Sequence, residues 1–143
     1  MRSDAARAMY ERDATAEAFG IELVEATTER AVVRMQVRPD MCNGLGVIHG
    51  GMTFLLADSA MAFASNSQGE AAFATSAGID WLAPATADQW LTATAVPRHV
   101  GGRSAVWDVT VDASDDEETQ GESIALFRGR TRKIGRPVVE LNG

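Results

Sequence analysis

One carboxylate stands in the most apolar stretch of the sequence. Residues 52–68 contain no Gly or Pro and are rich in Leu, Ala, Met and Phe, which favour helix over strand. Because this stretch is apolar almost all round, we expect a buried helix over about residues 50–67. Its single charge, Asp58, has apolar neighbours three and four positions away: Phe54, Leu55, Met61 and Ala62. Such surroundings raise a carboxyl pKa and strengthen the carboxylate as a base.

A glycine-rich turn precedes this helix. Residues 43–51 read NGLGVIHGG and place His49 and Gly50 at the expected helix start. Backbone N–H groups at a helix N-terminus are unpaired and stabilise developing negative charge. An acid, a histidine, the amide of Asn43 and a backbone donor in one stretch therefore indicate acyl chemistry, with Asp58 as the reactive carboxylate.

Each of these residues also has a plain structural interpretation, and the sequence leaves both open. Asp58 could accept a hydrogen bond from a neighbouring backbone or hydroxyl group, and His49 could cap the helix. Asn43 could be a turn residue. Gly50 and Gly51 could allow the backbone to pack closely against another group.

The spacing of these residues resembles a known pattern. Asn43, followed by residues 49–51 (HGG) and then by Asp58, resembles the hotdog-fold acyl-CoA thioesterases, in particular their phenylacetate-degradation (PaaI-type) branch. Residues 79–84, IDWLAP, resemble the third-strand motif of that family, and residues 125–130, ALFRGR, resemble its last-strand motif. The combination is far more specific than the His-Gly-Gly triplet alone.

The resemblance covers about residues 19–133 and implies hydrolysis of acyl-CoA thioesters, with aryl- or hydroxyaryl-acetyl groups as the acyl part. It implies no diffusible cofactor, since coenzyme A is part of the substrate. By the same resemblance, the Gly50 N–H polarises the thioester carbonyl, His49 contacts the thioester, and Asn43 orients the acyl group or the attacking water. Asp58 either activates water or attacks the thioester itself.

Further residues are candidates for substrate contacts. The resemblance places Thr75 and Ser76 on the strand that passes the active site in the family. Either residue could form a hydrogen bond to Asp58 or to water, or both could be plain strand residues. The second glycine, Gly51, is expected beside the substrate. Large apolar side chains could line an acyl pocket or belong to the core: Phe54, Met61, Phe63 and Trp81.

The phosphates of coenzyme A require cations on a protein whose net charge is −7. Arg98 and Arg103 flank the glycine pair 101–102 and are the first candidates. Three more arginines alternate and would share one strand face: Arg128, Arg130 and Arg132. The alternative is an exposed strand face whose charges are merely solvated.

Two other functions remain open. A non-catalytic acyl-CoA-binding module of the same fold would keep the pocket and the arginines but would need no acid at position 58. A hydratase of this fold is the second alternative, although its own His/Asp pattern is not the one present. An acid within an apolar stretch favours the enzyme.

The rest of the chain predicts a single hotdog domain of α+β class over residues 1–143. A helix is expected over residues 4–18, capped by Ser3 or Asp4. The acidic residues 112–119 are expected to form a solvated loop whose carboxylates need no partner. The order of elements gives one antiparallel sheet around the central helix, with a face or edge left for another subunit. Strands are expected over residues 21–26, 31–37, 71–82, 91–100, 104–112 and 122–134.

Composition excludes several classes of protein. The acidic balance argues against a nucleic-acid partner. No segment reaches membrane-spanning length, and the first residues contain no apolar signal core, so we expect no membrane partner and a cytoplasmic location. The two histidines, His49 and His99, belong to no pair with metal-ligand spacing, so no metal is expected.

A geometric argument predicts a second subunit. His49 and Asp58 are nine residues apart, which is roughly 13 Å along one helix. A catalytic acid and an oxyanion donor must both come within about 3 Å of the reacting centre. Two antiparallel helices across a two-fold axis would bring Asp58 of one chain to Gly50 and Asn43 of the other. The resemblance implies the same homodimer, often paired into a homotetramer.

Overall fold

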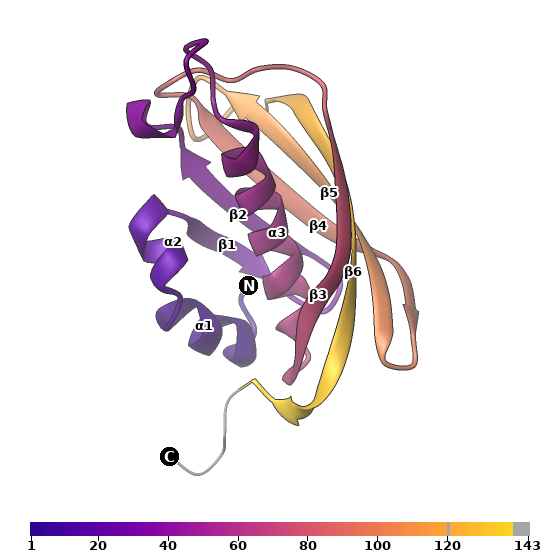
Figure 1. Cartoon of the computed structure of the whole chain (residues 1–143). Helices are drawn as coiled ribbons and strands as arrows, with labels where there is room; N and C mark the ends of the chain where they lie inside the picture. The colour runs from indigo at the N-terminus through magenta and orange to yellow at the C-terminus, as the bar shows by residue number, and fades with distance from the viewer. Residues whose placement is uncertain (120, 139–143) are drawn as a thin grey trace.

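The computed structural model describes residues 1–119 and 121–138 (Figure 1). In this part of the chain the α-helices are α1 (Asp4–Glu11), α2 (Ala14–Phe19) and α3 (Gly50–Asn66), and a short 3₁₀ helix spans Pro39–Met41. The strands are β1 (Glu22–Ala26), β2 (Ala31–Gln36), β3 (Glu70–Trp81), β4 (Trp90–Gly101), β5 (Ser104–Ser114) and β6 (Glu122–Pro137). All six expected strands are present, and their ends lie within three residues of the predicted ones.

The strands form one antiparallel sheet in the order β1-β2-β4-β5-β6-β3. The sheet curves around α3, and α1 and α2 lie on the same side of it as α3 (Figure 1). The predicted α+β architecture, an antiparallel sheet wrapped around a long central helix, is therefore confirmed.

Helix α3 is buried along the face that meets the sheet, whereas Leu55, Asp58, Ser59 and Ala62 form a half-buried stripe, so the prediction of a helix buried almost all round is only partly right. Leu56, Ala57, Ala60 and Phe63 are all 0 % exposed. They pack against the inward faces of β2, β4 and β5, where alternate residues are buried: Val33, Met35, Leu91, Ala93, Val109 and Val111. Neither α3 nor any other helix in the described ranges combines the length and apolarity needed to cross a membrane.

The N-terminal helix predicted over residues 4–18 is wrong in one respect, because it is two helices. The Asp13 carboxylate accepts a hydrogen bond from the Ala16 N–H at 2.9 Å, so Asp13 acts as the N-cap of α2. A short acidic side chain in extended backbone stabilises a new helix start and ends the previous helix. Ser3 caps α1 as predicted, since its hydroxyl oxygen accepts from the Ala6 N–H at 3.0 Å.

Strand β3 is an open edge of the sheet. It pairs with β6 on one side, and no other described strand pairs with its second side. Residues 74–78 are exposed, and two large apolar side chains on this strand, Phe73 and Trp81, are 53 % and 56 % exposed. An exposed edge of this kind is a template for pairing with another chain.

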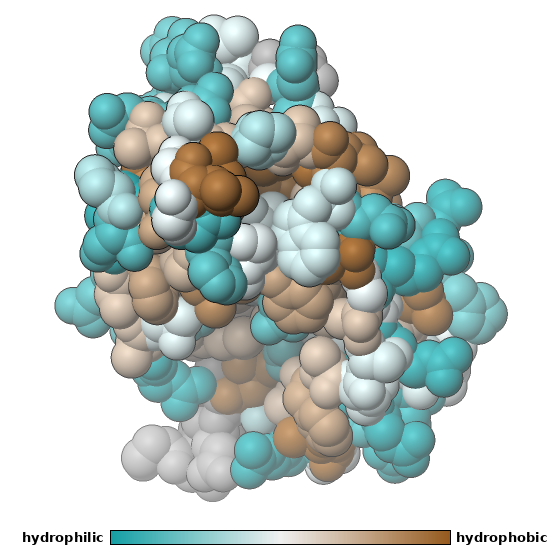
Figure 2. All heavy atoms as spheres, turned by 45° about the horizontal axis from the view of Figure 1, so that its top comes forward, coloured by the Kyte–Doolittle hydropathy of each residue, from teal (hydrophilic) through white to brown (hydrophobic). Residues whose placement is uncertain are grey.

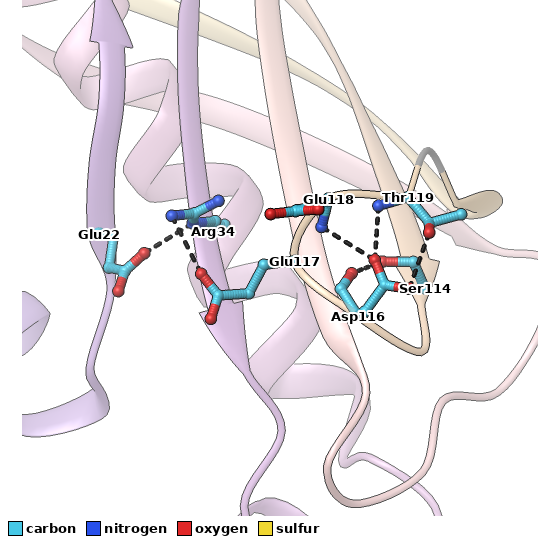
Figure 3. Close-up of polar contacts among 7 residues, drawn as sticks. All are labelled: Glu22, Arg34, Ser114, Asp116, Glu117, Glu118 and Thr119. Atoms are coloured by element: carbon cyan, nitrogen blue, oxygen red, sulfur yellow. Dashed lines mark hydrogen bonds and ion pairs between the residues drawn. The ribbon is translucent and has the colours of Figure 1, made fainter.

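The acidic loop between β5 and β6 is exposed at residues 115–119, as a solvated loop should be, but the prediction that its carboxylates need no partner is wrong. Glu117 lies 3.3 Å from the Arg34 guanidinium, which also pairs with Glu22 at 2.6 Å (Figure 3). The Asp116 carboxylate accepts hydrogen bonds from the backbone N–H groups of Glu118 and Thr119. Asp116 therefore shapes the loop, and Glu117 attaches it to β2 through Arg34, which folding brings beside it.

Candidate active site

The start of α3 is organised by its N-cap residue, His49. Its Nδ1 accepts a hydrogen bond from the Gly51 N–H at 2.9 Å. A neutral imidazole that accepts at Nδ1 carries its proton on Nε2. His49 is therefore the helix cap that the structural interpretation described, and it also presents an Nε2–H donor to whatever lies beside the helix start.

The Gly50 N–H is the free donor at this helix start. Within residues 1–119 and 121–138, no backbone or side-chain acceptor takes it. It is one of the first N–H groups of a 17-residue helix, where the helix dipole is positive. Because the Gly51 N–H is already bonded to His49, Gly50 supplies the amide that can meet a developing negative charge.

Trp81 packs directly on this helix start. Its indole Nε1–H donates to the Gly50 carbonyl oxygen at 3.2 Å. A Cβ atom on Gly50 would lie 3.0 Å from Trp81 Cε2, and one on Gly51 would lie 3.0 Å from His49 Nδ1. Each glycine therefore leaves room for one ring, and the close-packing interpretation of the glycine pair is correct.

An open hollow of about 360 Å³ lies beside Gly50. Figure 2 brings this end of the molecule forward, where brown apolar patches alternate with polar surface. Thr53 is 1 % exposed, and its hydroxyl finds no hydrogen-bond partner among the described residues. The hollow therefore borders both Gly50, whose N–H is free, and a residue whose buried hydroxyl lacks a partner. Its lining comes from α3 and two loops: Val47, Ile48, Gly50, Thr53, Trp81, Leu82, Ala83 and Pro84.

Asp58 is half-buried and has no hydrogen bond or ion pair within the described chain. The structural interpretation, a carboxylate bonded to a nearby backbone or hydroxyl group, is not realised there. Burial raises the pKa of the Asp58 carboxyl above its ordinary value of 3.8. An unpaired carboxylate with a raised pKa is chemically available as a base or a nucleophile.

Asn43 lies in the turn before α3. Its Oδ1 accepts from the Leu45 N–H at 2.9 Å, so the side chain stabilises its own turn. The Asn43 carboxamide nitrogen bonds no other part of the described chain, which leaves two N–H donors for a water or an acyl group. The turn role is established by this geometry, and the substrate role stays a prediction.

One protomer does not bring these groups together. Helix α3 is continuous from Gly50 to Asn66, so Gly50 and Asp58 are separated by about 12 Å of helix rise. The free amide and the unpaired carboxylate therefore lie about two turns apart on one rigid element.

The predicted substrate contacts lie in three places: the exposed edge of β3, the packed interior and the hollow beside Gly50. Thr75 and Ser76 are exposed on the β3 edge, and the Thr75 hydroxyl donates to the Arg130 carbonyl at 3.3 Å. Met61 is 1 % exposed and packs against Gly129. The Phe54 ring stacks edge-on against Phe127, and Phe63 against Tyr10. Among the apolar candidates, Trp81 is the one that borders the hollow beside Gly50.

The candidate phosphate ligands are not equally free. Arg98 and Arg128 both pair with Asp108, at 3.1 and 2.6 Å. Hydrogen bonding to Arg128, with a smaller attraction from Arg98, holds the pKa of the Asp108 carboxyl below its ordinary value. Arg103, Arg130 and Arg132 have no ion pair in the described chain, and Arg130 and Arg132 lie exposed on the same face of β6 as Arg128. Of these three, Arg103 borders a small hollow together with Lys133, and this second cation makes it the better candidate for an external phosphate.

Sequence reasoning missed three features of this region. The unpaired hydroxyl of Thr53 could not be predicted, because the sequence does not show whether a Thr within a helix finds a hydrogen-bond partner. The bond between Trp81 and Gly50 joins residues 31 positions apart, and Arg103 in the β4–β5 turn comes close to Lys133 in β6. Such tertiary contacts leave no local pattern. Among the described residues, no group of three or more His, Cys, Asp or Glu could hold a metal ion.

Comparison with known proteins agrees with this geometry. Residues 45–120 match the Thioesterase superfamily. The acyl-coenzyme A thioesterase PaaI of Escherichia coli K12 is 45 % identical over 130 residues, which cover 91 % of this chain and 89 % of that protein. The solved structure of E. coli PaaI, from the phenylacetic acid degradation operon, matches with a TM-score of 0.86 at 42 % identity and covers 96 % of this chain and 99 % of that one.

A second solved structure, a mutant of the phenylacetic acid degradation protein PaaI from Thermus thermophilus, is 34 % identical with a TM-score of 0.78, covering 85 % of this chain and 100 % of that one. The sheet, the central helix and the polar helix start define a hotdog-fold protein. The chain belongs to the thioesterase superfamily.

Asp58→Asn should stabilise the folded protein at neutral pH. A raised folded-state pKa means that the folded state binds more protons than the unfolded state just above pH 3.8, so stability falls as the pH rises through that window. Asparagine removes this effect, and the stability gain over the parent should grow from about pH 3.8 upward and then level off above the raised pKa.

Urea unfolding of both proteins at a series of pH values, from just below the ordinary pKa of 3.8 upward, measures this difference. Glu11→Gln, on the exposed face of α1, is the matched carboxylate-to-amide control and should show no such trend. A gain for Asp58→Asn that is the same at every pH would show that the carboxylate carries no cost of burial.

Proposed function

We propose that this protein hydrolyses acyl-CoA thioesters to a free acid and coenzyme A, with aryl- or hydroxyaryl-acetyl groups as the preferred acyl part. One observation carries the proposal: Asp58 is an unpaired carboxylate in a buried helix whose own start presents the free Gly50 N–H. The similarity to the E. coli relative, an acyl-coenzyme A thioesterase from a phenylacetic acid degradation operon, supports it.

In the proposed mechanism two groups on α3 have different roles: Gly50, at the start of the helix, and Asp58, about two turns further along. The Gly50 N–H stabilises the negative charge that grows on the thioester oxygen. Asp58 either removes a proton from water, whose oxygen forms the new bond to carbon, or attacks that carbon itself before water hydrolyses the intermediate. In both routes the C–S bond breaks and coenzyme A leaves as a thiolate that takes up a proton. His49 and Asn43 orient the thioester and the water.

For Gly50 and Asp58 to act on the same thioester, two chains are required. The amide and the carboxylate are about 12 Å apart in rise along one straight helix, and both must reach one carbon atom. A two-fold axis that sets two copies of α3 antiparallel brings Asp58 of one protomer to Gly50 of its partner and forms two equivalent sites. The open edge of β3 is available for the same association. A homotetramer of two such dimers stays a prediction, as does a cytoplasmic location.

Asp58→Asn should abolish nearly all thioester hydrolysis while leaving affinity for coenzyme A unchanged. The amide is isosteric but cannot act as a base or form an acyl intermediate. Thiol release is measured with a panel of aryl and aliphatic CoA thioesters, and coenzyme A binding is measured by calorimetry, with Glu11→Gln as the control. Turnover near the parent rate in a folded Asp58→Asn protein would refute the catalytic role. A parent that binds thioesters but releases no thiol would be a binding module.

Arg103→Ala should raise KM for CoA thioesters about tenfold with little change in kcat, because a charge-assisted hydrogen bond contributes about 1.5–3 kcal/mol. Arg98→Ala should raise KM less, since Arg98 already pairs with Asp108. Steady-state kinetics at low salt tests both, and Arg7→Ala on exposed α1 is the charge-matched control. Unchanged affinity in both variants would place the phosphate site elsewhere.

The shared site predicts complementation between inactive chains. Asp58→Ala and His49→Ala proteins, unfolded and refolded together, should recover thiol release, whereas each refolded alone should stay inactive. A mixed dimer contains one site with every group intact and one with both defects, so recovery should approach roughly a quarter of the parent activity when chains mix statistically. Differently tagged chains show by pull-down that mixed dimers form. Mixed dimers without activity would mean that the groups meet within one protomer.

A further inference from the structure

The peptide unit between Gly50 and Gly51 is held at both of its polar groups by aromatic rings. Its carbonyl oxygen accepts the Trp81 Nε1–H at 3.2 Å, and its N–H donates to His49 Nδ1 at 2.9 Å. We propose that Trp81 is a positioning residue that, together with His49, fixes this peptide and so holds the adjacent Gly50 N–H in the direction of the thioester oxygen. This inference rests on the proposed function and adds to it a residue that acts without touching the reacting atoms.

Two consecutive glycines make this constraint necessary. Glycine has the widest range of backbone conformations, and the first turn of a helix lacks the hydrogen bonds that hold later turns. An oxyanion donor is effective when it is already in place before the charge develops. Gly50 and Gly51 would be a poor choice for a fixed donor unless something outside the helix restrained them, and the two rings provide that restraint.

The ring contact adds to the hydrogen bond. A Cβ on Gly50 would lie 3.0, 3.1 and 3.2 Å from the Trp81 atoms Cε2, Nε1 and Cζ2, so the indole sits against the Cα of Gly50. Trp81 is nevertheless 56 % exposed in the protomer. Burial of the whole ring therefore does not account for its place, whereas the bond to Gly50 does.

Trp81→Phe separates positioning from simple lining of the hollow. Phenylalanine keeps an aromatic ring at the site but has no N–H donor. We expect kcat for CoA thioesters to fall about tenfold, part of the loss seen when an oxyanion donor is removed outright, with KM changed by less than about twofold. Trp90→Phe is the matched control and should keep the parent kcat, because Trp90 packs on Arg34 and lies in β4, which β5 and β6 separate from β3 in the sheet.

A measurement on the free protein tests the restraint without turnover. Glycine pairs occur twice in the sequence, at Gly50-Gly51 and Gly101-Gly102. In protein labelled with ¹³C′,¹⁵N-glycine, an HNCO spectrum therefore contains these two correlations. Loss of the Trp81 bond should move the Gly50 carbonyl carbon upfield, whereas the Gly101 carbonyl, in the β4–β5 hairpin, should stay in place.

The outcomes are distinct. An active parent whose Trp81→Phe variant keeps the parent kcat overturns the positioning role, and so does an unmoved Gly50 carbonyl signal. A parent that hydrolyses no thioester overturns the proposed function and the positioning role with it, even if the carbonyl signal moves.

If Trp81→Phe does not fold, the Gly50→Ala variant tests the same positioning role. Gly50→Ala adds a Cβ that must displace the indole. It should lower kcat, and adding Trp81→Leu to it should lower kcat little further, because the bond between the two residues is already lost. Effects of the two substitutions that are additive in free energy would overturn the positioning role.

Discussion

Burial of α3 against the sheet is the constraint on which the rest of the structure depends. A helix whose residues Leu56, Ala60 and Phe63 are fully enclosed cannot turn or slide without opening the core, since protein interiors are close-packed. Its two polar features are thereby fixed in space. The N-terminal amide of Gly50 has no partner in the described chain, and Asp58 stays half-buried without one. The reactive character of both groups follows from the packing of the apolar residues around them.

Rigidity also explains why packing and chemistry are not rival interpretations of His49-Gly50-Gly51. Each glycine lacks a Cβ because a ring occupies that place, Trp81 at the first and His49 at the second. The same two rings bond the peptide between the glycines. Close packing of the two rings therefore fixes the flexible glycine pair and, with it, the Gly50 N–H donor. Glycine is required here for steric reasons, and the result is a donor held in place for a developing negative charge.

The sequence predicts the elements well and the tertiary contacts poorly, for physical reasons. The long apolar run and the alternating strands are local patterns, and α3 begins at the expected Gly50, with His49 as its N-cap. The motif residues Asn43 and Asp58 are recognisable because their spacing along the chain is itself the pattern. The break at Asp13 escaped prediction because one side chain tips the balance between a continued helix and a new one. Pairings such as Arg34 with Glu117 depend on how strands and loops come together, and no local pattern encodes them.

The ion pairs formed in the fold also decide which cations are free to bind the phosphates of coenzyme A. With a net charge of −7, the protein as a whole repels a polyanion such as coenzyme A, although salt screens that repulsion beyond about 10 Å at roughly 0.1 M ionic strength. Attraction must therefore be local and come from cations whose charge is not already neutralised. Asp108 neutralises part of the charge of Arg98 and Arg128, and Glu22 and Glu117 hold Arg34. Arg103, Arg130 and Arg132 have no such partner in the described chain, so the ion pairs that stabilise the sheet limit which arginines are free to bind an anion.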